Sequence, residues 1–213
     1  QAALGRLSAA HGQQHGMLVA DVLALEGVLP IIGGTGFDIL INNSAGPAGG
    51  ALLGAHDDQL LDVFRQHVLG NQQLVRAIVP GMQSRQWGRI VNIISTSVKE
   101  PITMLGVSNT IRGAVASWAK TLAGELAADG ITVNNVLPGY TRTQRLEQIL
   151  KERAETTGKS EENIAAAMLA TVPVARFADA EEVAHAVAFL CQPQSGYING
   201  INLPVDGGRT KSL

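Results

Sequence analysis

The sequence predicts an α/β fold in which a doubly wound parallel sheet carries helices on both faces. Short runs rich in β-branched residues alternate with longer segments of helical apolar spacing, which is the pattern of stacked βαβ units. Glycine supplies 24 of the 213 residues and aromatic residues only 4%, and this composition favours the tight turns of α/β proteins. The length corresponds to about one domain, and no repeat or linker divides the chain, so we expect residues 1–213 to form a single domain.

The elements follow from the two periodicities, in chain order. Runs that are short and rich in β-branched residues predict strands at Met17–Ala20, Ile39–Ile41, Arg89–Ile94, Thr132–Val136 and Ile201–Val205. Segments with apolar residues at i, i+3 and i+4 predict helices at Ala24–Ile31, Asp57–Gln83, Ser108–Ala128 and Glu181–Cys191. In the third helix, one apolar stripe contains Val115, Trp118, Ala119, Leu122 and Leu126.

Two segments depart from this alternation. The segment from Thr143 to Ala175 has helical character at Arg145–Arg153 and Glu161–Leu169 but contains no strand. Ligands of open α/β sheets bind outside the carboxyl ends of the strands, so we expect residues 143–175 to be a lid over a substrate cleft; the alternative is a pair of packing helices. At the start, Gln1–His11 is interpreted as the end of a helix that leads directly into the first strand.

Charge and hydropathy exclude several classes of function. The formal net charge is −2 and no two basic residues are adjacent, so the phosphate-neutralising surface of a nucleic-acid binder is missing. No apolar stretch is long enough for a membrane span and no signal peptide is recognisable, which predicts a cytoplasmic protein. The single Cys191 cannot form an internal disulfide and lies in an apolar run, so we expect a buried structural thiol and no metal site.

Polar or small residues follow three of the predicted strands. The turn Asn42-Asn43-Ser44-Ala45-Gly46-Pro47 follows the second, Ser95 follows the third, and Pro138-Gly139 with Tyr140, Thr141 and Thr143 follows the fourth. A Val205-Asp206-Gly207-Gly208 segment ends the last strand. Because the carboxyl ends of parallel strands meet at one edge of a sheet, we expect these groups to surround a ligand site.

In this order, the motifs resemble those of the short-chain dehydrogenase/reductase family, and the resemblance covers essentially the whole chain. That family has an Asn-Asn-Ala-Gly turn, a catalytic Ser at a strand end, a Tyr-x-x-x-Lys motif, a Pro-Gly turn and a Val-Asp-Gly-Gly segment. The resemblance implies a Rossmann-like sheet, an NAD or NADP cofactor, and hydride transfer to or from a carbonyl or alcohol substrate. Among members, the chain is similar to 3-oxoacyl-carrier-protein reductases.

The catalytic motif departs from the family. With Ser95 at the position of the family's catalytic Ser, Ser108 stands where the Tyr is expected and Arg112 where the Lys is expected. A serine hydroxyl is a far weaker acid than a phenol, and a guanidinium stays charged and does not shuttle protons. We therefore expect Ser95 to polarise the substrate oxygen and Arg112 to hold the cofactor ribose, while the family's proton relay is lost.

Two side chains are candidates for the missing proton donor. Tyr140 offers a phenol directly after Pro138-Gly139, the alternative being an aromatic lining of the cleft. His67 matches the family's helix Asn that orders a relay water, and an unperturbed imidazole titrates near pH 6.5. The alternative for His67 is a helix histidine satisfied by backbone groups.

The resemblance also implies the cofactor contacts. They are Asp21, Val22, Asn43, Ser44, Ala45, Gly46, Arg112, Pro138, Gly139, Thr141 and Thr143. The family's Gly-rich phosphate turn would lie before Gln1, because the Gly33–Gly36 run precedes a strand and does not replace it. We therefore expect roughly 30 or more further residues upstream, about one βαβ unit, and these would choose between NAD and NADP.

Three functions are open at this point. The first is the oxidoreductase described above, and the second is a nucleotide-binding module that has lost turnover. The third is a non-redox enzyme on the same scaffold, since halohydrin dehalogenases also carry Arg at the Lys position. The expected partners are a small-molecule carbonyl or alcohol and further copies of the chain, as a homodimer or homotetramer.

Overall fold

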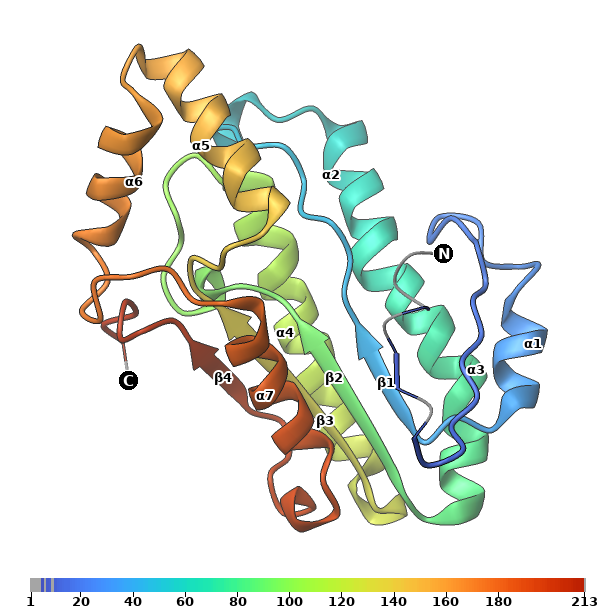
Figure 1. Cartoon of the computed structure of the whole chain (residues 1–213). Helices are drawn as coiled ribbons and strands as arrows, with labels where there is room; N and C mark the ends of the chain where they lie inside the picture. The colour runs from blue at the N-terminus through green and yellow to red at the C-terminus, as the bar shows by residue number, and fades with distance from the viewer. Residues whose placement is uncertain (1–4, 6, 9, 213) are drawn as a thin grey trace.

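The computed structural model describes residue 5, residues 7–8 and residues 10–212 (Figure 1). Its sheet contains four parallel strands in the order β1-β2-β3-β4. The strands are β1 (Ile39–Asn42), β2 (Gly88–Ile93), β3 (Ile131–Pro138) and β4 (Asn202–Val205). Parallel neighbours need crossover connections, and helices supply them here. The predicted α/β fold with a parallel sheet is confirmed.

Helices connect and flank the strands. They are α1 (Leu29–Thr35), α2 (Asp57–Phe64), α3 (Gly70–Arg85), α4 (Gly106–Leu126), α5 (Gln144–Thr157), α6 (Glu161–Leu169) and α7 (Ala180–Cys191). A π-helical turn, Arg65–Leu69, joins α2 to α3, so the predicted helix Asp57–Gln83 is one long element with an internal irregularity. Among the described residues, none of the helices combines the length and the apolar character that a membrane span needs.

Two helical layers cover the sheet because side chains alternate between the faces of each strand. Ile90 of β2 and Val133 of β3 point to one face and form a buried cluster with the apolar stripes of α3 and α4. Val91 and Val136 point to the other face and pack against Val183 of α7. Figure 1 shows α7 in front of β2 and β3 with α4 behind them. Packing on both faces therefore fixes the positions of the carboxyl ends of the strands relative to one another.

Two predictions for the first part of the chain are wrong. Met17–Ala20 is not a strand, and Val19 is 85% exposed. A strand is stable only where a neighbour pairs its backbone groups, and the four-stranded sheet of the described residues does not include Met17–Ala20. The helix predicted at Ala24–Ile31 is displaced to α1, whose first turn contains Pro30. Proline is tolerated there because the first-turn N–H groups have no helical partner.

The first residues of the chain and residues 143–175 are the two segments outside the predicted alternation of strands and helices. Within the predicted helix end Gln1–His11, residues 1–4, 6 and 9 lie outside the described residues, and Leu7, Ser8, Ala10 and His11 are not helical. The two helices predicted between Thr143 and Ala175 are confirmed as α5 and α6. They pack on each other through a buried cluster of Leu146, Ile164 and Met168.

An asparagine ladder crosses the whole sheet. Asn42, Asn92, Asn135 and Asn202 occupy paired register positions on β1, β2, β3 and β4. Asn42 Nδ2 donates to Asn92 Oδ1 at 2.8 Å, Asn92 Nδ2 to Asn135 Oδ1 at 2.9 Å, and Asn135 Nδ2 to Asn202 Oδ1 at 2.8 Å. Buried amides must be paired to avoid a desolvation penalty. Sliding any strand by one residue would break the ladder, so it specifies the register.

Replacing the middle of the ladder is expected to destabilise the fold more than replacing its end. Asn92→Ala leaves Asn42 Nδ2 and Asn135 Oδ1 without partners in the core, and we expect a loss of roughly 2–5 kcal/mol of unfolding free energy. Asn202→Ala is the matched control, because it leaves only Asn135 Nδ2 unpaired, at about 1–2 kcal/mol. Urea unfolding measures both, and equal losses would contradict a cooperative ladder.

Candidate functional site

A cavity of about 970 Å³ opens at the carboxyl ends of β1, β2 and β3. The turn after β1, the end of β2, the start of α4 and the turn after β3 form its inner wall. The first turns of α5 and the sheet-facing side of α7 form its outer wall. A site at this edge is expected in open α/β sheets, because the ends of parallel strands place their following loops together. The volume is in the range of small-molecule and cofactor sites.

Most residues predicted from the sequence lie in this wall. The cavity-lining members are Asn43, Ser44, Ala45, Gly46, Ser95, Ser108, Arg112, Pro138, Gly139, Tyr140, Thr141 and Thr143. Asp21, Val22 and His67 do not line it. Asp21 is exposed and its carboxylate accepts from the N–H of Leu23 at 2.9 Å, which makes a local turn. Because Met17–Ala20 is not a strand, Asp21 and Val22 are not held at a strand end.

Ser95 is placed so that its hydroxyl can donate into the cavity. It follows β2 in extended conformation and caps the 3₁₀ turn Thr96–Val98. Its Oγ accepts from the N–H of Ser97 at 3.1 Å, which occupies a lone pair and leaves the hydroxyl hydrogen for another acceptor. Ser108 lies in the first turn of α4 and Arg112 one turn further on, so the two share a helix face. All three line the same cavity.

Arg112 is a buried cation without a carboxylate partner among the described residues. Its side chain is 8% exposed, and Nη1 donates to the carbonyl of Ile93 at 2.8 Å. Burial lowers the pKa of Arg112 to about 10, so the guanidinium stays protonated at neutral pH. Arg65, Arg85, Arg142 and Arg176 each form an ion pair with a carboxylate, whereas Arg112 forms none within the described chain. Its charge is therefore available to a ligand.

His67 lies behind the wall, in the π-helical turn between α2 and α3. It is 3% exposed, and its Nδ1 is hydrogen bonded to the hydroxyl of Ser44 at 3.1 Å. Its Nε2 is buried with no partner among the described residues. Burial, followed by the positive charge of Arg112, lowers the pKa of His67 to about 4. The imidazole is therefore neutral at physiological pH, and it contacts the wall residue Ser44 without lining the cavity itself.

Tyr140 lines the cavity and is held by contacts on its ring. The ring meets that of Phe177 edge to face at a centroid distance of 6.3 Å. The guanidinium of Arg209 stacks on Tyr140 at 4.8 Å from the ring centroid, a cation–π contact that favours this orientation. The aromatic-lining interpretation and the phenol-donor interpretation both agree with this position.

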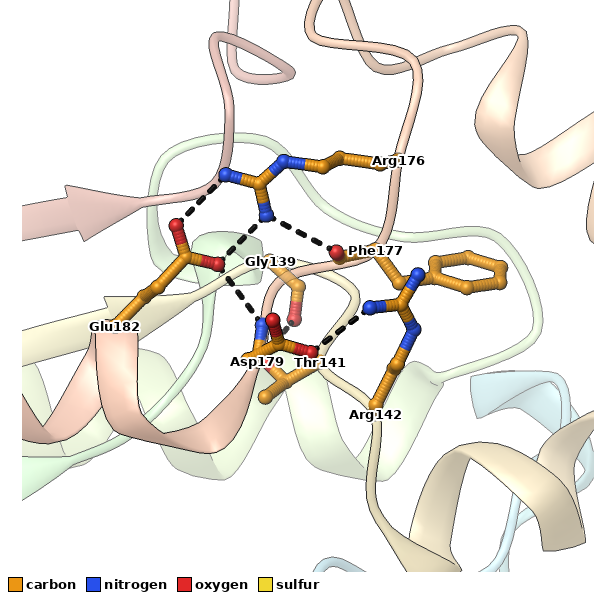
Figure 2. Close-up of polar contacts among 7 residues, drawn as sticks. All are labelled: Gly139, Thr141, Arg142, Arg176, Phe177, Asp179 and Glu182. Carbon is orange, nitrogen blue, oxygen red and sulfur yellow. Dashed lines mark hydrogen bonds and ion pairs between the residues drawn. The ribbon is translucent and has the colours of Figure 1, made fainter.

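Two ion pairs lie at the start of α7, and the one between Arg142 and Asp179 connects the turn after β3 to this helix (Figure 2). Arg142 Nη1 contacts Asp179 at 2.8 Å, and Arg176 contacts both carboxylate oxygens of Glu182 at 2.6 and 2.7 Å. Asp179 and Glu182 also form the capping box of α7. Hydrogen bonds to Arg176 and to the Asp179 N–H lower the pKa of Glu182 to about 2. Backbone hydrogen bonds from the N–H of Ala178 to the carbonyl of Tyr140 and from the N–H of Arg142 to the carbonyl of Ala178 join the same two segments.

Comparison with known proteins identifies the family. A family model described as enoyl-(acyl carrier protein) reductase matches residues 31–210. The 3-oxoacyl-[acyl-carrier-protein] reductase FabG of Vibrio harveyi is 30% identical over 211 residues, which is 97% of this chain and 81% of that protein. The chain belongs to the short-chain dehydrogenase/reductase family.

Solved structures of this family share the fold. The YwfH reductase, described as NADPH dependent and involved in bacilysin biosynthesis, is 27% identical with a TM-score of 0.86, over 92% of this chain and 78% of that one. The L-sorbose reductase from Gluconobacter frateurii, solved with NADPH and L-sorbose, is 30% identical with a TM-score of 0.84, over 92% and 76%. The resemblance inferred from the motifs is confirmed.

Some wall residues of this short-chain dehydrogenase/reductase were missed by the sequence analysis. Arg145 of α5 lines the cavity, and so does the thiol-bearing Cys191 at the end of α7. The prediction of a buried thiol is wrong, because Cys191 is only partly buried and lines the cavity; this partial burial raises the pKa of the thiol. The signal for Arg145 was its position in the predicted lid, two residues after Thr143. Among the described residues, no cluster of three or more His, Cys, Asp or Glu side chains is arranged to hold a metal ion.

The depressed pKa of His67 makes stability pH-dependent in a defined window. An unfolded histidine binds a proton below about pH 6.5, whereas the folded one does so only near 4. The free energy of unfolding is therefore highest, as far as His67 is concerned, above about pH 6.5. It decreases as the pH falls toward 4, by about 3 kcal/mol in all. The unfolding free energy is measured at pH about 7.5 and 4.5. His67→Asn should make the difference between these two values smaller by the part that His67 causes. His185→Asn, on the exposed side of α7, should leave it in place.

Proposed function

We propose that this chain is an NAD(P)-dependent oxidoreductase acting on a small carbonyl or alcohol. The observation that carries the proposal is the convergence of Ser95, Ser108 and Arg112 on one cavity at the strand carboxyl ends. The reductases among its relatives and the NADPH-bound neighbour support the same reaction class. Both NAD and NADP are included in the proposal.

The donor set of the cavity fits the nicotinamide half of such a cofactor. Asn43 and Thr143 offer an amide and a hydroxyl, and Arg112 offers a planar set of N–H donors for ribose hydroxyls. Small residues at Ala45 and Gly46 let a ligand approach the turn after β1. When bound, the nicotinamide supplies a hydride to the carbonyl carbon or accepts one from the alcohol carbon.

Each residue then has a defined task. Ser95 donates a hydrogen bond to the substrate oxygen, which gains negative charge as the hydride arrives at carbon. Ser108 adds a second hydroxyl beside that oxygen, and the Arg112 cation stabilises the developing alkoxide because the buried site screens its charge weakly. The alkoxide must finally take a proton. We propose that Tyr140 supplies it, because Tyr140 lines the cavity whereas His67 does not.

Binding of a nucleotide without turnover is the second candidate. It is favoured by Ser108 and Arg112, which replace a phenol and an ammonium expected from the family motif. Neither a serine hydroxyl nor a guanidinium transfers protons well near neutral pH. Titration with NADH and NADPH, followed by absorbance in the presence of ketones and aldehydes, separates the two. Oxidation of the cofactor supports the enzyme, and binding without oxidation supports the module.

The chain is also proposed to assemble as a homodimer or homotetramer. Gly113 and Gly124 lie on the exposed side of α4 with open space around their Cα atoms, which permits close approach of a second helix. Sedimentation of the purified protein at monomer mass would contradict this.

Ser95→Ala is expected to lower kcat for carbonyl reduction roughly 10²- to 10³-fold, because it removes the hydrogen bond that strengthens as the oxyanion forms. Ser97→Ala is the matched control. Its hydroxyl is buried without a partner among the described residues and does not line the cavity, so kcat should stay within about twofold. Steady-state rates of NAD(P)H oxidation give kcat for both variants. An equal loss of kcat in the two would contradict the proposed role of Ser95.

Tyr140→Phe tests the proton donor while keeping the ring that packs on Phe177 and Arg209. We expect kcat to fall by about 10²-fold or more and the pH dependence of kcat to change. His67→Asn should lower kcat by less than about tenfold, since the neutral imidazole does not line the cavity. A larger loss of kcat in His67→Asn than in Tyr140→Phe would indicate that the Ser44–His67 pair donates the proton.

A further inference from the structure

The charge of the cavity wall is one-sided. Arg112 and Arg145 are its charged residues among those that the structure describes, and no Asp, Glu, Lys or His accompanies them there. Much of the remaining wall is apolar, with Ile39, Ile41 and the α7 side chain Val187 as examples. The protein as a whole carries a net charge of −2. A site of two positive charges in a protein of opposite sign attracts anions and repels cations.

Arg145 is held in place without being neutralised. It lies in the first turn of α5 and is partly buried. Its Nη2 donates to the carbonyl of Pro47 at 2.9 Å, which ties α5 to the turn after β1. No carboxylate in the described part of the chain forms an ion pair with it, whereas its neighbour Arg142 is paired with Asp179. A guanidinium has five N–H donors, so one contact leaves an edge free for a ligand.

The two guanidiniums border the same short stretch of backbone. Arg145 contacts Pro47, and a Cβ built on the preceding Gly46 would lie 3.8 Å from Nη2 of Arg112. Arg112 is the deeper of the two, beside Ser108, and Arg145 lies at the outer wall formed by α5. A ligand that reaches Ser95 and Ser108 from the α5 side therefore passes Arg145.

Resting on the oxidoreductase function proposed above, we propose that Arg145 is a specificity-determining residue that binds a carboxylate of the substrate. The substrate class is then an oxo acid or the corresponding hydroxy acid. Its reacting oxygen lies at Ser95 and its carboxylate accepts hydrogen bonds from the free edge of Arg145. The planar fork of a guanidinium matches the two oxygens of a carboxylate. Arg112 adds to the positive potential without leaving its place beside Ile93.

The test compares oxo acids of increasing chain length with their methyl esters, which keep the ketone and lose the charge. For the wild-type protein we expect kcat/KM to favour the acid of the best length by about tenfold or more. Arg145→Gln should bring the ratio of acid to ester close to one, mainly through KM of the acid. Arg145→Lys should restore part of the preference. Arg153→Gln, the matched loss of charge on α5 outside the cavity wall, should keep the wild-type ratio.

Calorimetry separates the possible failures. Arg145→Gln should weaken binding of the oxo acid about tenfold and leave the dissociation constants of NADH and NADPH unchanged. Weaker cofactor binding in this variant would assign Arg145 to the cofactor phosphates and overturn the proposal. A wild-type protein that prefers the ester over the acid would overturn it as well. If no ketone is reduced but the acid binds through Arg145, the oxidoreductase function fails and the carboxylate site stands.

Discussion

Parallel pairing of four strands in one register is the constraint on which the rest of this structure depends. It brings the segments that follow β1, β2 and β3 to one edge of the sheet, where they form the cavity. The asparagine ladder makes that register specific, because its four amides pair only when the strands are aligned as observed. Apolar packing alone would tolerate more freedom, since Val and Ile contacts are not directional. The polar core therefore determines where Ser95 and Asn43 lie.

The second determinant is the buried charge of Arg112. An isolated cation in a core is unfavourable, and here one carbonyl bond and the adjacent cavity are its compensation. The same charge contributes to the low pKa of His67, which keeps that imidazole neutral and limits its use as an acid. Together with Arg145, it gives the cavity a positive character that is opposite to the net charge of the chain. The charge of the cavity is thus set by the few residues that line it, and it does not follow from the net charge of the chain.

Particular elements show how far the sequence can be interpreted. The short runs Arg89–Ile94 and Thr132–Val136 predict strands because they are rich in β-branched residues, and these strands are present as β2 and β3. The segment Met17–Ala20, in which Val19 is the single β-branched residue, is not a strand and lies outside the described sheet. At the site, Ser95 and Arg112 could be identified from motif spacing, whereas Arg145 could not, because its place in the wall depends on how α5 folds over the turn after β1.

The sequence by itself determined the α/β class, the order of the elements from Ile39 onward and which residues follow each of these strands, because these depend on periodicity and on spacing along the chain. Its motifs also carried the resemblance to the family. The tertiary structure decided which of those residues share a cavity, that His67 stands behind Ser44, and that two guanidiniums border one turn. The physical reason is that burial, desolvation and charge coupling arise between residues far apart in sequence, and only the packed chain brings them together.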